Sequence, residues 1–118
     1  PGGAIVHVAS IEAWHPLPAH AHYAASKAGI VALVRAAAHE LGPAVRVNGV
    51  APGLIAREGL EEDWPEGVAR YTAASALDRL VGPQEVADVV RFLAGPASRG
   101  LTGVTVPVDG GVTSGAGW

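Results

Sequence analysis

The 118-residue sequence contains no cysteine, no methionine and a single lysine. Without cysteine the chain can form no disulfide bond, use no thiolate nucleophile and build no zinc site from cysteine ligands. No apolar stretch reaches the roughly 18 residues that a membrane-spanning helix needs, and the first residues do not resemble a signal peptide. We therefore expect a cytoplasmic protein that has no membrane partner.

Basic residues are also scarce, because eight lysine and arginine residues stand against eleven acidic ones and the net charge is -3. The basic residues lie singly along the chain and form no stripe of the kind that neutralises the phosphates of nucleic acids. The sequence therefore argues against a nucleic-acid partner. With 49% hydrophobic residues, the composition instead predicts one globular domain with a buried core.

The chain begins with a proline, and it contains no methionine at which translation could start. We therefore expect residues 1–118 to be part of a longer protein.

The first half of the sequence predicts a strand, a loop, a helix and a second strand. Residues 4–9 form a short apolar run that ends at Ser10, and two prolines then exclude regular structure from residues 11–20. Residues 21–41 are free of proline, rich in alanine and followed by a Gly-Pro pair, which predicts a long helix. Residues 44–51 alternate valine with polar residues, which predicts a strand that ends before Pro52 and Gly53.

The second half begins with an acidic segment, residues 56–80, in which we expect at most weak helical pieces and a mobile flap. Pro83 then begins a helix with an apolar stripe that closes at Gly95. Residues 104–108 predict a third strand, and Pro107 places it at or near a sheet edge because proline cannot donate to the ladder. The tail, residues 110–118, is expected to be loosely ordered.

This alternation of strands and helices predicts an α/β fold with a parallel sheet. In such sheets ligands bind beyond the carboxyl ends of the strands, where Ser10 and the Pro52-Gly53 pair fall. Three strands and two main helices leave one edge of the sheet unpaired, so we expect a further part on the N-terminal side.

Three residues carry a pattern that suits proton transfer. Tyr23 and Lys27 are four positions apart in the predicted helix and so share one face of it, and Lys27 is the only lysine of the chain. A fixed ammonium group near a phenol favours the phenolate form, and its remaining donors can hold a ribose hydroxyl. Ser10 can hold a substrate oxygen against the tyrosine hydroxyl. Together the three residues predict a site that interconverts a carbonyl and an alcohol.

These residues and their spacing resemble the short-chain dehydrogenase/reductase family. Ser10 stands thirteen residues before Tyr23, and the motif Tyr-Ala-Ala-Ser-Lys ends at Lys27. Four further segments resemble the C-terminal half of the family in the same order: residues 3–6, 46–53, 82–87 and 108–111. The resemblance therefore covers essentially the whole chain.

The resemblance implies that residues 1–118 are the C-terminal catalytic part of one Rossmann-type, doubly wound domain and supply its last three strands. The family's first four strands, its glycine-rich turn and the residue that separates NAD from NADP precede this part. It also implies that NAD or NADP is the cofactor, that the substrate is a small alcohol or ketone, and that residues 56–80 are a substrate lid.

The resemblance also implies roles for individual residues. Tyr23 is the general acid or base, Lys27 assists it and holds the nicotinamide ribose, and Ser10 positions the substrate oxygen. The nicotinamide side is lined by Pro52, Gly53 and Ile55. The family commonly has a threonine where this sequence has Arg57, whose guanidinium can serve a phosphate or leave the loop non-productive.

Other residues suit more than one interpretation. Trp14 and His15 lie in the loop after Ser10 and are candidates for substrate contact or for loop packing. His20 and His22 lie beside Tyr23 with no carboxylate or cysteine at a recognisable ligand spacing, so we interpret them as pocket lining rather than as metal ligands. Asn48 is expected to tie the second strand to neighbouring backbone.

Two alternatives to an oxidoreductase remain. The chain alone can be catalytically silent and act as a folding or assembly unit, since the resemblance implies a homo-oligomer built through the 21–41 helix and the 83–108 region. The protein can also use the same fold for epimerisation or dehydration.

Overall fold

A three-stranded parallel sheet forms the centre of the computed structural model, which describes residues 2–118. The strands are β1 (Gly3–Val8), β2 (Val45–Pro52) and β3 (Thr105–Val108), and they lie in the order β1-β2-β3. In register, Gly3 of β1 pairs with Val45 of β2, and Gly49 of β2 pairs with Thr105 of β3. The α/β class and the three predicted strands are confirmed, with strand bounds shifted by one residue. The prediction that Pro107 lies at or near a sheet edge is confirmed as well, because β3 is an outer strand of this three-stranded sheet.

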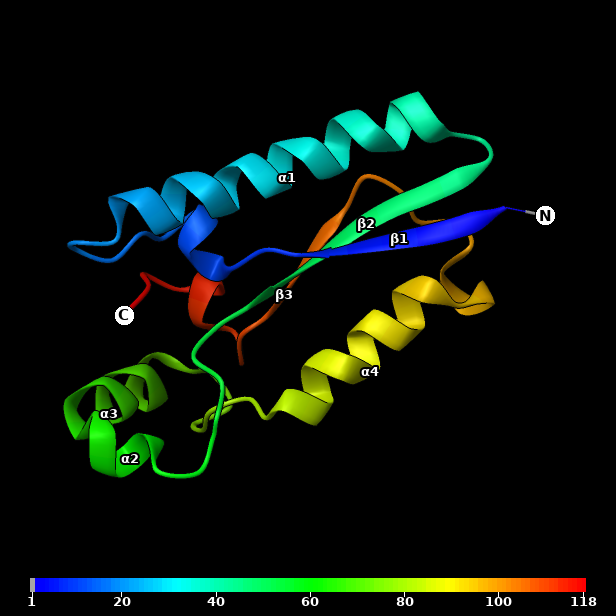
Figure 1. The fold of residues 1–118 in the computed structure, drawn as a ribbon. Helices are drawn as coiled ribbons and strands as arrows, with labels where there is room; N and C mark the ends of the chain where they lie inside the picture. The colour runs from blue at the N-terminus through cyan, green and yellow to red at the C-terminus, as the bar shows by residue number, and fades with distance from the viewer. Residues whose placement is uncertain (1) are drawn as a thin grey trace.

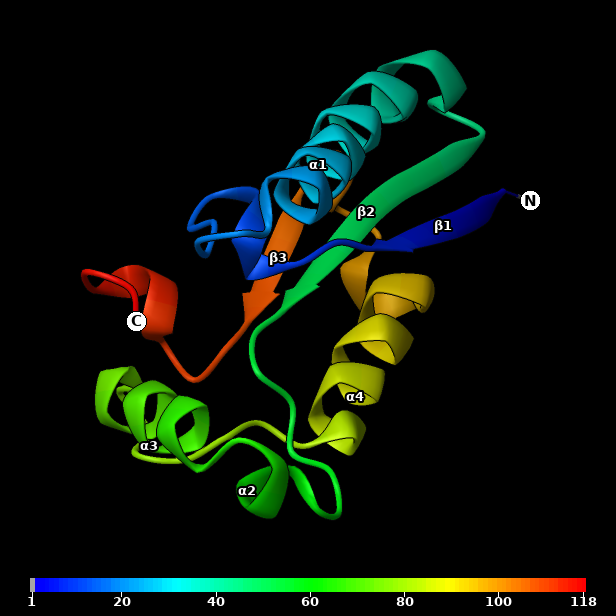
Figure 2. The same cartoon turned by 60° about the vertical axis from the view of Figure 1, so that its left-hand side comes forward.

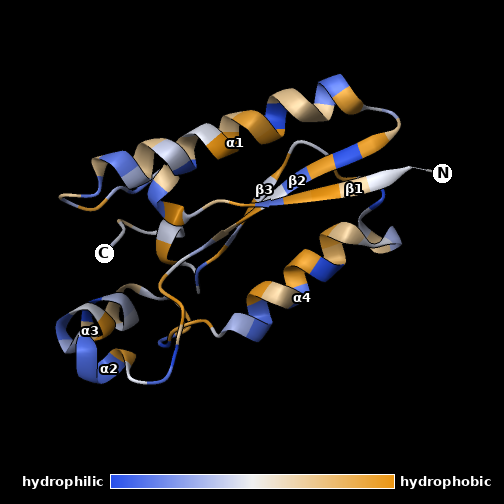
Figure 3. Cartoon of the chain, viewed as in Figure 1, coloured by the Kyte–Doolittle hydropathy of each residue, from blue (hydrophilic) through white to orange (hydrophobic). Residues whose placement is uncertain are grey.

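Two long helices cover opposite faces of this sheet (Figures 1 and 2). On one face α1 (Ala21–Leu41) buries Val31, Val34 and Ala38, while α4 (Pro83–Ala94) lies on the other face and buries Leu93. The predicted bounds of both helices are confirmed, because proline and glycine mark their ends in the sequence. Since helices cover both faces of the middle strand, residues 47–51 of β2 are buried. Figure 3 shows the apolar residues that run along β1 and β2 between the two helices.

The side chains of β2 also fix the chain segment that follows α4. The Arg46 guanidinium donates hydrogen bonds to five acceptors near the C-terminal end of α4, among them the Leu93 carbonyl at 3.2 Å and the Gly95 carbonyl at 3.0 Å. Asn48 donates to the Leu101 carbonyl and accepts from the Val104 N–H. The predicted structural role of Asn48 is thereby confirmed.

Residues 56–80 are more regular than the sequence indicates. They contain the short helix α2 (Leu60–Asp63) and the ten-residue helix α3 (Pro65–Ala74), which lie beyond the carboxyl ends of β2 and β3 (Figure 2). The expectation of weak helical pieces at most was wrong for α3. Pro65 occupies the first turn of this helix, and the Tyr71 side chain anchors it with no exposed surface.

The C-terminal tail is also packed, which corrects the expectation that it is loosely ordered. A short 3-10 helix, η3 (Val112–Ser114), buries Val112 completely. The Trp118 ring then packs edge-on against Tyr71, with ring centroids 4.9 Å apart, and tilted against Trp64 at 5.6 Å. The tail and α3 therefore share one aromatic cluster next to the core.

No helix within residues 2–118 combines the length and the apolar character that crossing a membrane requires.

Candidate functional site

The carboxyl ends of β1 and β2 bring the first candidate residues to one edge of the sheet. Ser10 follows β1 after one residue, is only 7% exposed, and caps the 3-10 helix η1 (Ile11–Ala13). Its hydroxyl oxygen accepts a hydrogen bond from the Glu12 N–H at 3.1 Å. Because that bond uses an acceptor site, the Ser10 hydroxyl hydrogen remains available for a ligand.

Tyr23 and Lys27 face this edge from the first turns of α1. The Lys27 Nζ atom donates to the Val8 carbonyl at the end of β1 at 3.1 Å, and it lies 5.6 Å from the centre of the Tyr23 ring. The Tyr23 side chain is 39% exposed. The hydrogen bond to Val8 thus holds the ammonium group of the single lysine beside the phenol ring, as the four-residue spacing predicts.

Ser10 and Tyr23 line the same cavity, which has a volume of about 200 Å³. The other residues that line it are Ile11, Glu12, Gly53, Leu54 and Trp118. A serine hydroxyl, a tyrosine hydroxyl and the chain that leaves β2 therefore meet around a space that can hold a small molecule.

A second cavity, of about 450 Å³, shares two lining residues, Tyr23 and Glu12, with the first. His20 and His22 also line this second cavity, which confirms the interpretation that they are pocket residues. His20 Nδ1 lies 2.9 Å from Glu12 Oε1. Within residues 2–118, histidine and acidic side chains form no group of three or more that could hold a metal ion.

The end of β2 is packed against α3 and the start of the tail. A Cβ atom on Gly53 would overlap the Tyr71 hydroxyl oxygen, so only glycine fits at this approach. Tyr71 donates to the Asp109 carbonyl at 2.7 Å. Burial first, and the charge of Asp109 second, raise the pKa of the Tyr71 hydroxyl to about 12, against a hydrogen bond from the Leu54 main chain that lowers it.

Beyond Gly53, Ile55 pairs with Val81 in an isolated parallel bridge, in which the Ala56 N–H donates to the Val81 carbonyl. The Ile55 N–H makes no hydrogen bond within residues 2–118. Ile55 therefore has an unused donor near the carboxyl edge of the sheet.

Three further candidates lie outside the cavity that Ser10 and Tyr23 share. Trp14, 41% exposed, and His15 follow η1 and are not among the residues that line that cavity. Arg57 forms an ion pair with Asp63 of α2 at 2.8 Å, between two largely exposed side chains. Its guanidinium is thus partnered within the 56–80 segment.

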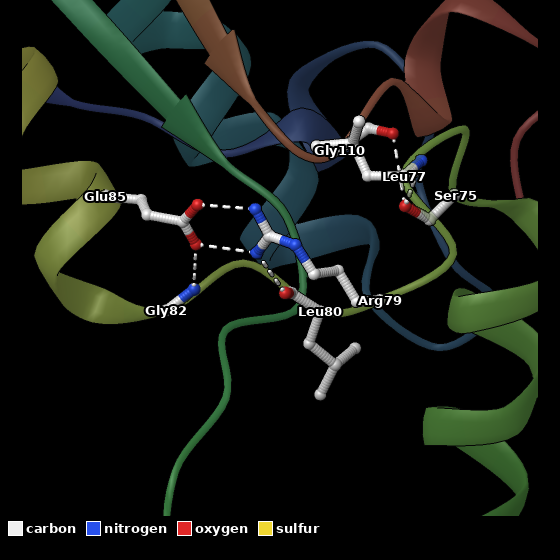
Figure 4. Close-up of polar contacts among 7 residues, drawn as sticks. All are labelled: Ser75, Leu77, Arg79, Leu80, Gly82, Glu85 and Gly110. Carbon is white, nitrogen blue, oxygen red and sulfur yellow. Dashed lines mark hydrogen bonds and ion pairs between the residues drawn. The ribbon is translucent and has the colours of Figure 1, made fainter.

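A polar cluster connects the end of this segment to α4 and to the turn after β3 (Figure 4). Arg79 donates two hydrogen bonds to the Glu85 carboxylate, at 2.7 and 2.9 Å, and the Gly82 N–H donates to the same carboxylate. The hydrogen bonds from Arg79 lower the pKa of Glu85 to about 2, and the bond from Gly82 adds to this effect. On the other side Ser75 donates to the Gly110 carbonyl. The cluster holds the C-terminal end of the 56–80 segment against the start of α4 and the turn after β3.

Four residues in or behind the site were not predicted from the sequence: Glu12, Leu54 and Trp118 line the cavity, and Tyr71 packs against Gly53. Glu12 could have been predicted, because it lies only two positions after Ser10 and belongs to the same loop. The other three come together through contacts between distant parts of the chain, and no local pattern signals them.

The fold and the geometry together define the class of protein. It is an α/β protein with a parallel sheet covered on both faces, and polar side chains meet at the carboxyl edge, where sheets of this kind bind ligands.

Comparison with known proteins identifies the family within that class. A family model described as enoyl-(acyl carrier protein) reductase matches residues 1–113. The chain is 43% identical over 113 residues to the 3-oxoacyl-[acyl-carrier-protein] reductase of Thermotoga maritima, and it is 40% identical over 112 residues to the (3R)-3-hydroxyacyl-CoA dehydrogenase of Rattus norvegicus. Each alignment covers 93% of this chain. The chain belongs to the short-chain dehydrogenase/reductase family.

Solved structures agree with this assignment. A gluconate 5-dehydrogenase from Burkholderia cenocepacia, in complex with NADP and tartrate, superposes with a TM-score of 0.88 at 27% identity. That alignment covers 98% of this chain and 46% of the other. The curated relatives are likewise covered over 45% and 43% of their length, so the chain spans less than half of the proteins that it matches.

Proposed function

We propose that this chain is the C-terminal catalytic part of a single-domain, NAD- or NADP-dependent oxidoreductase that interconverts a secondary alcohol and a ketone. The observation that carries the proposal is the cavity shared by Ser10 and Tyr23, beside which Lys27 is held by the Val8 carbonyl. Membership of the short-chain dehydrogenase/reductase family supports it. The preceding part of the domain would supply the remainder of the cofactor site.

In this proposal Tyr23 handles the proton and Ser10 positions the substrate. The Ser10 hydroxyl donates to the substrate oxygen and holds it near the tyrosine hydroxyl. In reduction the carbonyl carbon gains hydride, while the Tyr23 hydroxyl gives its proton to the oxygen, so an alcohol forms. In oxidation Tyr23 takes that proton back. The ammonium group of Lys27 stabilises the negative charge that develops on the phenol oxygen.

The residues present fit a nicotinamide dinucleotide, which when bound supplies or accepts the hydride. Lys27 uses one of its three N–H groups on Val8, which leaves two for ribose hydroxyls. The Ile55 N–H has no partner within residues 2–118, and in this proposal it donates to the carboxamide of the nicotinamide. Pro52 ends β2 and Gly53 follows it, and in this proposal the two residues line the nicotinamide side. None of these four residues determines whether NAD or NADP is bound.

Substrate contact is proposed for the loop after Ser10 and for the 56–80 segment. Trp14 and His15 directly follow η1, in the loop that begins at Ser10. The 56–80 segment contributes α2 and α3 beyond the strand ends (Figure 1), which suits a lid over bound substrate. Changing Trp14 to Ala would test the loop by its effect on KM.

The test of the proposed function is turnover of a Tyr23→Phe variant, made in the protein that joins residues 1–118 to the preceding part of the domain. The phenylalanine keeps the ring and removes the proton that the proposal needs. Loss of turnover with retained NADH or NADPH binding is the expected result, and full activity would refute the proposal.

A second function, as a silent folding or assembly unit, is supported by the surface of the chain. Leu33 and Leu41 of α1 and Phe92 of α4 are large apolar side chains that are 41–48% exposed. We propose that the 21–41 helix and the 83–108 region form contacts between copies in a homo-oligomer. Sedimentation of a Leu33→Glu variant tests this, since a smaller species is expected. Fluorescence titration of the 118-residue chain with NADH and NADPH separates the two functions, because a silent unit binds neither.

A further inference from the structure

A carboxylate and an imidazole form a pair next to Tyr23. His20 Nδ1 lies 2.9 Å from Glu12 Oε1 and 3.2 Å from Glu12 Oε2. The Glu12 side chain is 13% exposed, whereas that of His20 is 47% exposed. The pair thus has a largely buried acceptor and an accessible ring.

Glu12 is fixed at both ends by the loop that begins at Ser10. Its N–H donates to the Ser10 hydroxyl oxygen at 3.1 Å, and its carboxylate accepts from the Leu17 N–H at 3.3 Å. The carboxylate that receives His20 is therefore held in position by the same loop that presents Ser10 to the cavity.

The carboxylate determines which nitrogen of His20 is free. A carboxylate only accepts hydrogen bonds, so His20 Nδ1 carries the hydrogen in the neutral and in the protonated ring alike. Nε2 then faces away from Glu12, as an acceptor in the neutral ring and as a donor in the protonated one. A hydroxyl group can both donate and accept, so it is a partner that suits either state of the ring.

The His20 ring lies close enough to Tyr23 for one substrate molecule to contact both side chains. The rings of His20 and Tyr23 meet edge-on, with centroids 6.2 Å apart. Both line the cavity of about 450 Å³, while Tyr23 and Glu12 also line the smaller cavity with Ser10. A molecule whose carbonyl lies between Ser10 and Tyr23 can therefore extend past Tyr23 toward the imidazole.

We propose that His20, oriented by Glu12, binds a second oxygen of the substrate, and that the substrate is a hydroxy ketone or the corresponding diol. The inference rests on the proposed function, because it takes Tyr23 as the residue at the reacting oxygen. His20 is a specificity-determining residue that contacts substrate, and Glu12 is a positioning residue that acts through it.

The test compares acetoin with butanone, two ketones that differ by one hydroxyl next to the carbonyl. The protein is the one that joins residues 1–118 to the preceding part of the domain, assayed with NADH and NADPH. His20→Phe keeps an aromatic ring and removes the hydrogen bond, and Glu12→Ala keeps the imidazole and releases it. His39→Phe, in the last turn of α1, is the matched control.

We expect the original protein to prefer acetoin in kcat/KM and His20→Phe to lower that preference about tenfold, the effect of one hydrogen bond. Glu12→Ala should lower it by a smaller factor, mainly through KM, and His39→Phe should leave it unchanged. Turnover with the same ratio in His20→Phe as in the original protein would overturn the inference, because the pair would then only hold the loop together.

A second measurement detects binding to His20 without turnover, so it tests this inference independently of the proposed function. Nitrogen NMR of the same protein, labelled in the histidine rings, should show a hydrogen on His20 Nδ1 and a shift of Nε2 with acetoin that butanone does not cause. If no ketone is turned over but this shift appears, the proposed function fails and the binding site stands. Equal responses of Nε2 to both ketones would overturn the inference whether or not turnover occurs.

Discussion

The Tyr71 hydroxyl donates a hydrogen bond of 2.7 Å to the main-chain carbonyl of Asp109 and so ties α3 to the turn that follows β3. Both residues are buried, and Gly53 packs directly against the same hydroxyl. The hydrogen bond therefore joins the 56–80 segment to the chain after β3, and the same hydroxyl packs against Gly53, which lines the candidate site.

Tyr71 should make stability depend on pH in the alkaline range. Its pKa is raised from 10.0 to about 12, so the folded protein keeps the neutral phenol where the unfolded chain has lost the proton. This contribution is complete below about pH 10 and is lost as pH rises through about 12, with a total of about 3 kcal/mol in the free energy of unfolding. Denaturant unfolding at a series of alkaline pH values measures it.

The control for this prediction is Tyr71→Phe, which has no proton to lose. This variant should be less stable at neutral pH by about 1–3 kcal/mol, because the buried Asp109 carbonyl loses its donor. If its unfolding free energy declines between pH 10 and 12 as steeply as that of the original chain, Tyr71 is not the group responsible.

Gly53→Ala should destabilise the fold. The new Cβ would overlap the Tyr71 hydroxyl oxygen and lie 2.8 Å from Cζ of the same ring, so the buried tyrosine must move. Overpacking of this kind costs about 1–3 kcal/mol. Gly29→Ala is the control, since no atom outside its own helix lies within 4 Å of the added Cβ, and alanine favours the helix by about 1 kcal/mol. The melting temperatures of the two variants should shift in opposite directions from that of the original chain. Equal melting temperatures would contradict the geometry.

Glu85 should contribute to stability at neutral pH and cease to do so in acid. Because Arg79 lowers its pKa from 4.5 to about 2, the contribution is present above about pH 4.5 and is lost as pH falls through about 2. The free energy of unfolding of the original chain should therefore fall more steeply over this range than that of Glu85→Gln. Glu40→Gln, which changes an exposed glutamate of α1, should retain the original slope. Identical slopes in all three proteins would exclude Glu85 as a source of acid sensitivity.

The sequence predicted those elements whose signals are local. The helix from Ala21 to Leu41 has a proline-free, alanine-rich body and a Gly-Pro end, and its bounds agree with the structure. The spacing of Tyr23 and Lys27 predicted that the two side chains lie together, because helix geometry alone determines it. The spacing did not predict the hydrogen bond from Lys27 to the Val8 carbonyl, which fixes the ammonium group at the end of β1.

The remainder depends on contacts between distant residues. The α3 helix has acidic neighbours and little apolar pattern, and it is held by Tyr71 against Gly53 and Asp109, 18 and 38 residues away. Trp118 completes the cavity around Ser10 although it is 108 positions further along the chain. No local pattern contains such information, so the packed tail and the full lining of the site could be found only in the structure.

The role of Tyr23 as proton donor is tested most directly by the single-turnover rate of the Tyr23→Phe variant, in the protein that joins residues 1–118 to the preceding part of the domain. A ketone is mixed with the preformed complex of enzyme and reduced cofactor, and the absorbance of the nicotinamide is followed. We predict a rate at least about a hundredfold below that of the original protein, with cofactor affinity unchanged, because the proton donor is missing. A rate equal to that of the original protein would contradict the assignment of Tyr23 as the proton donor.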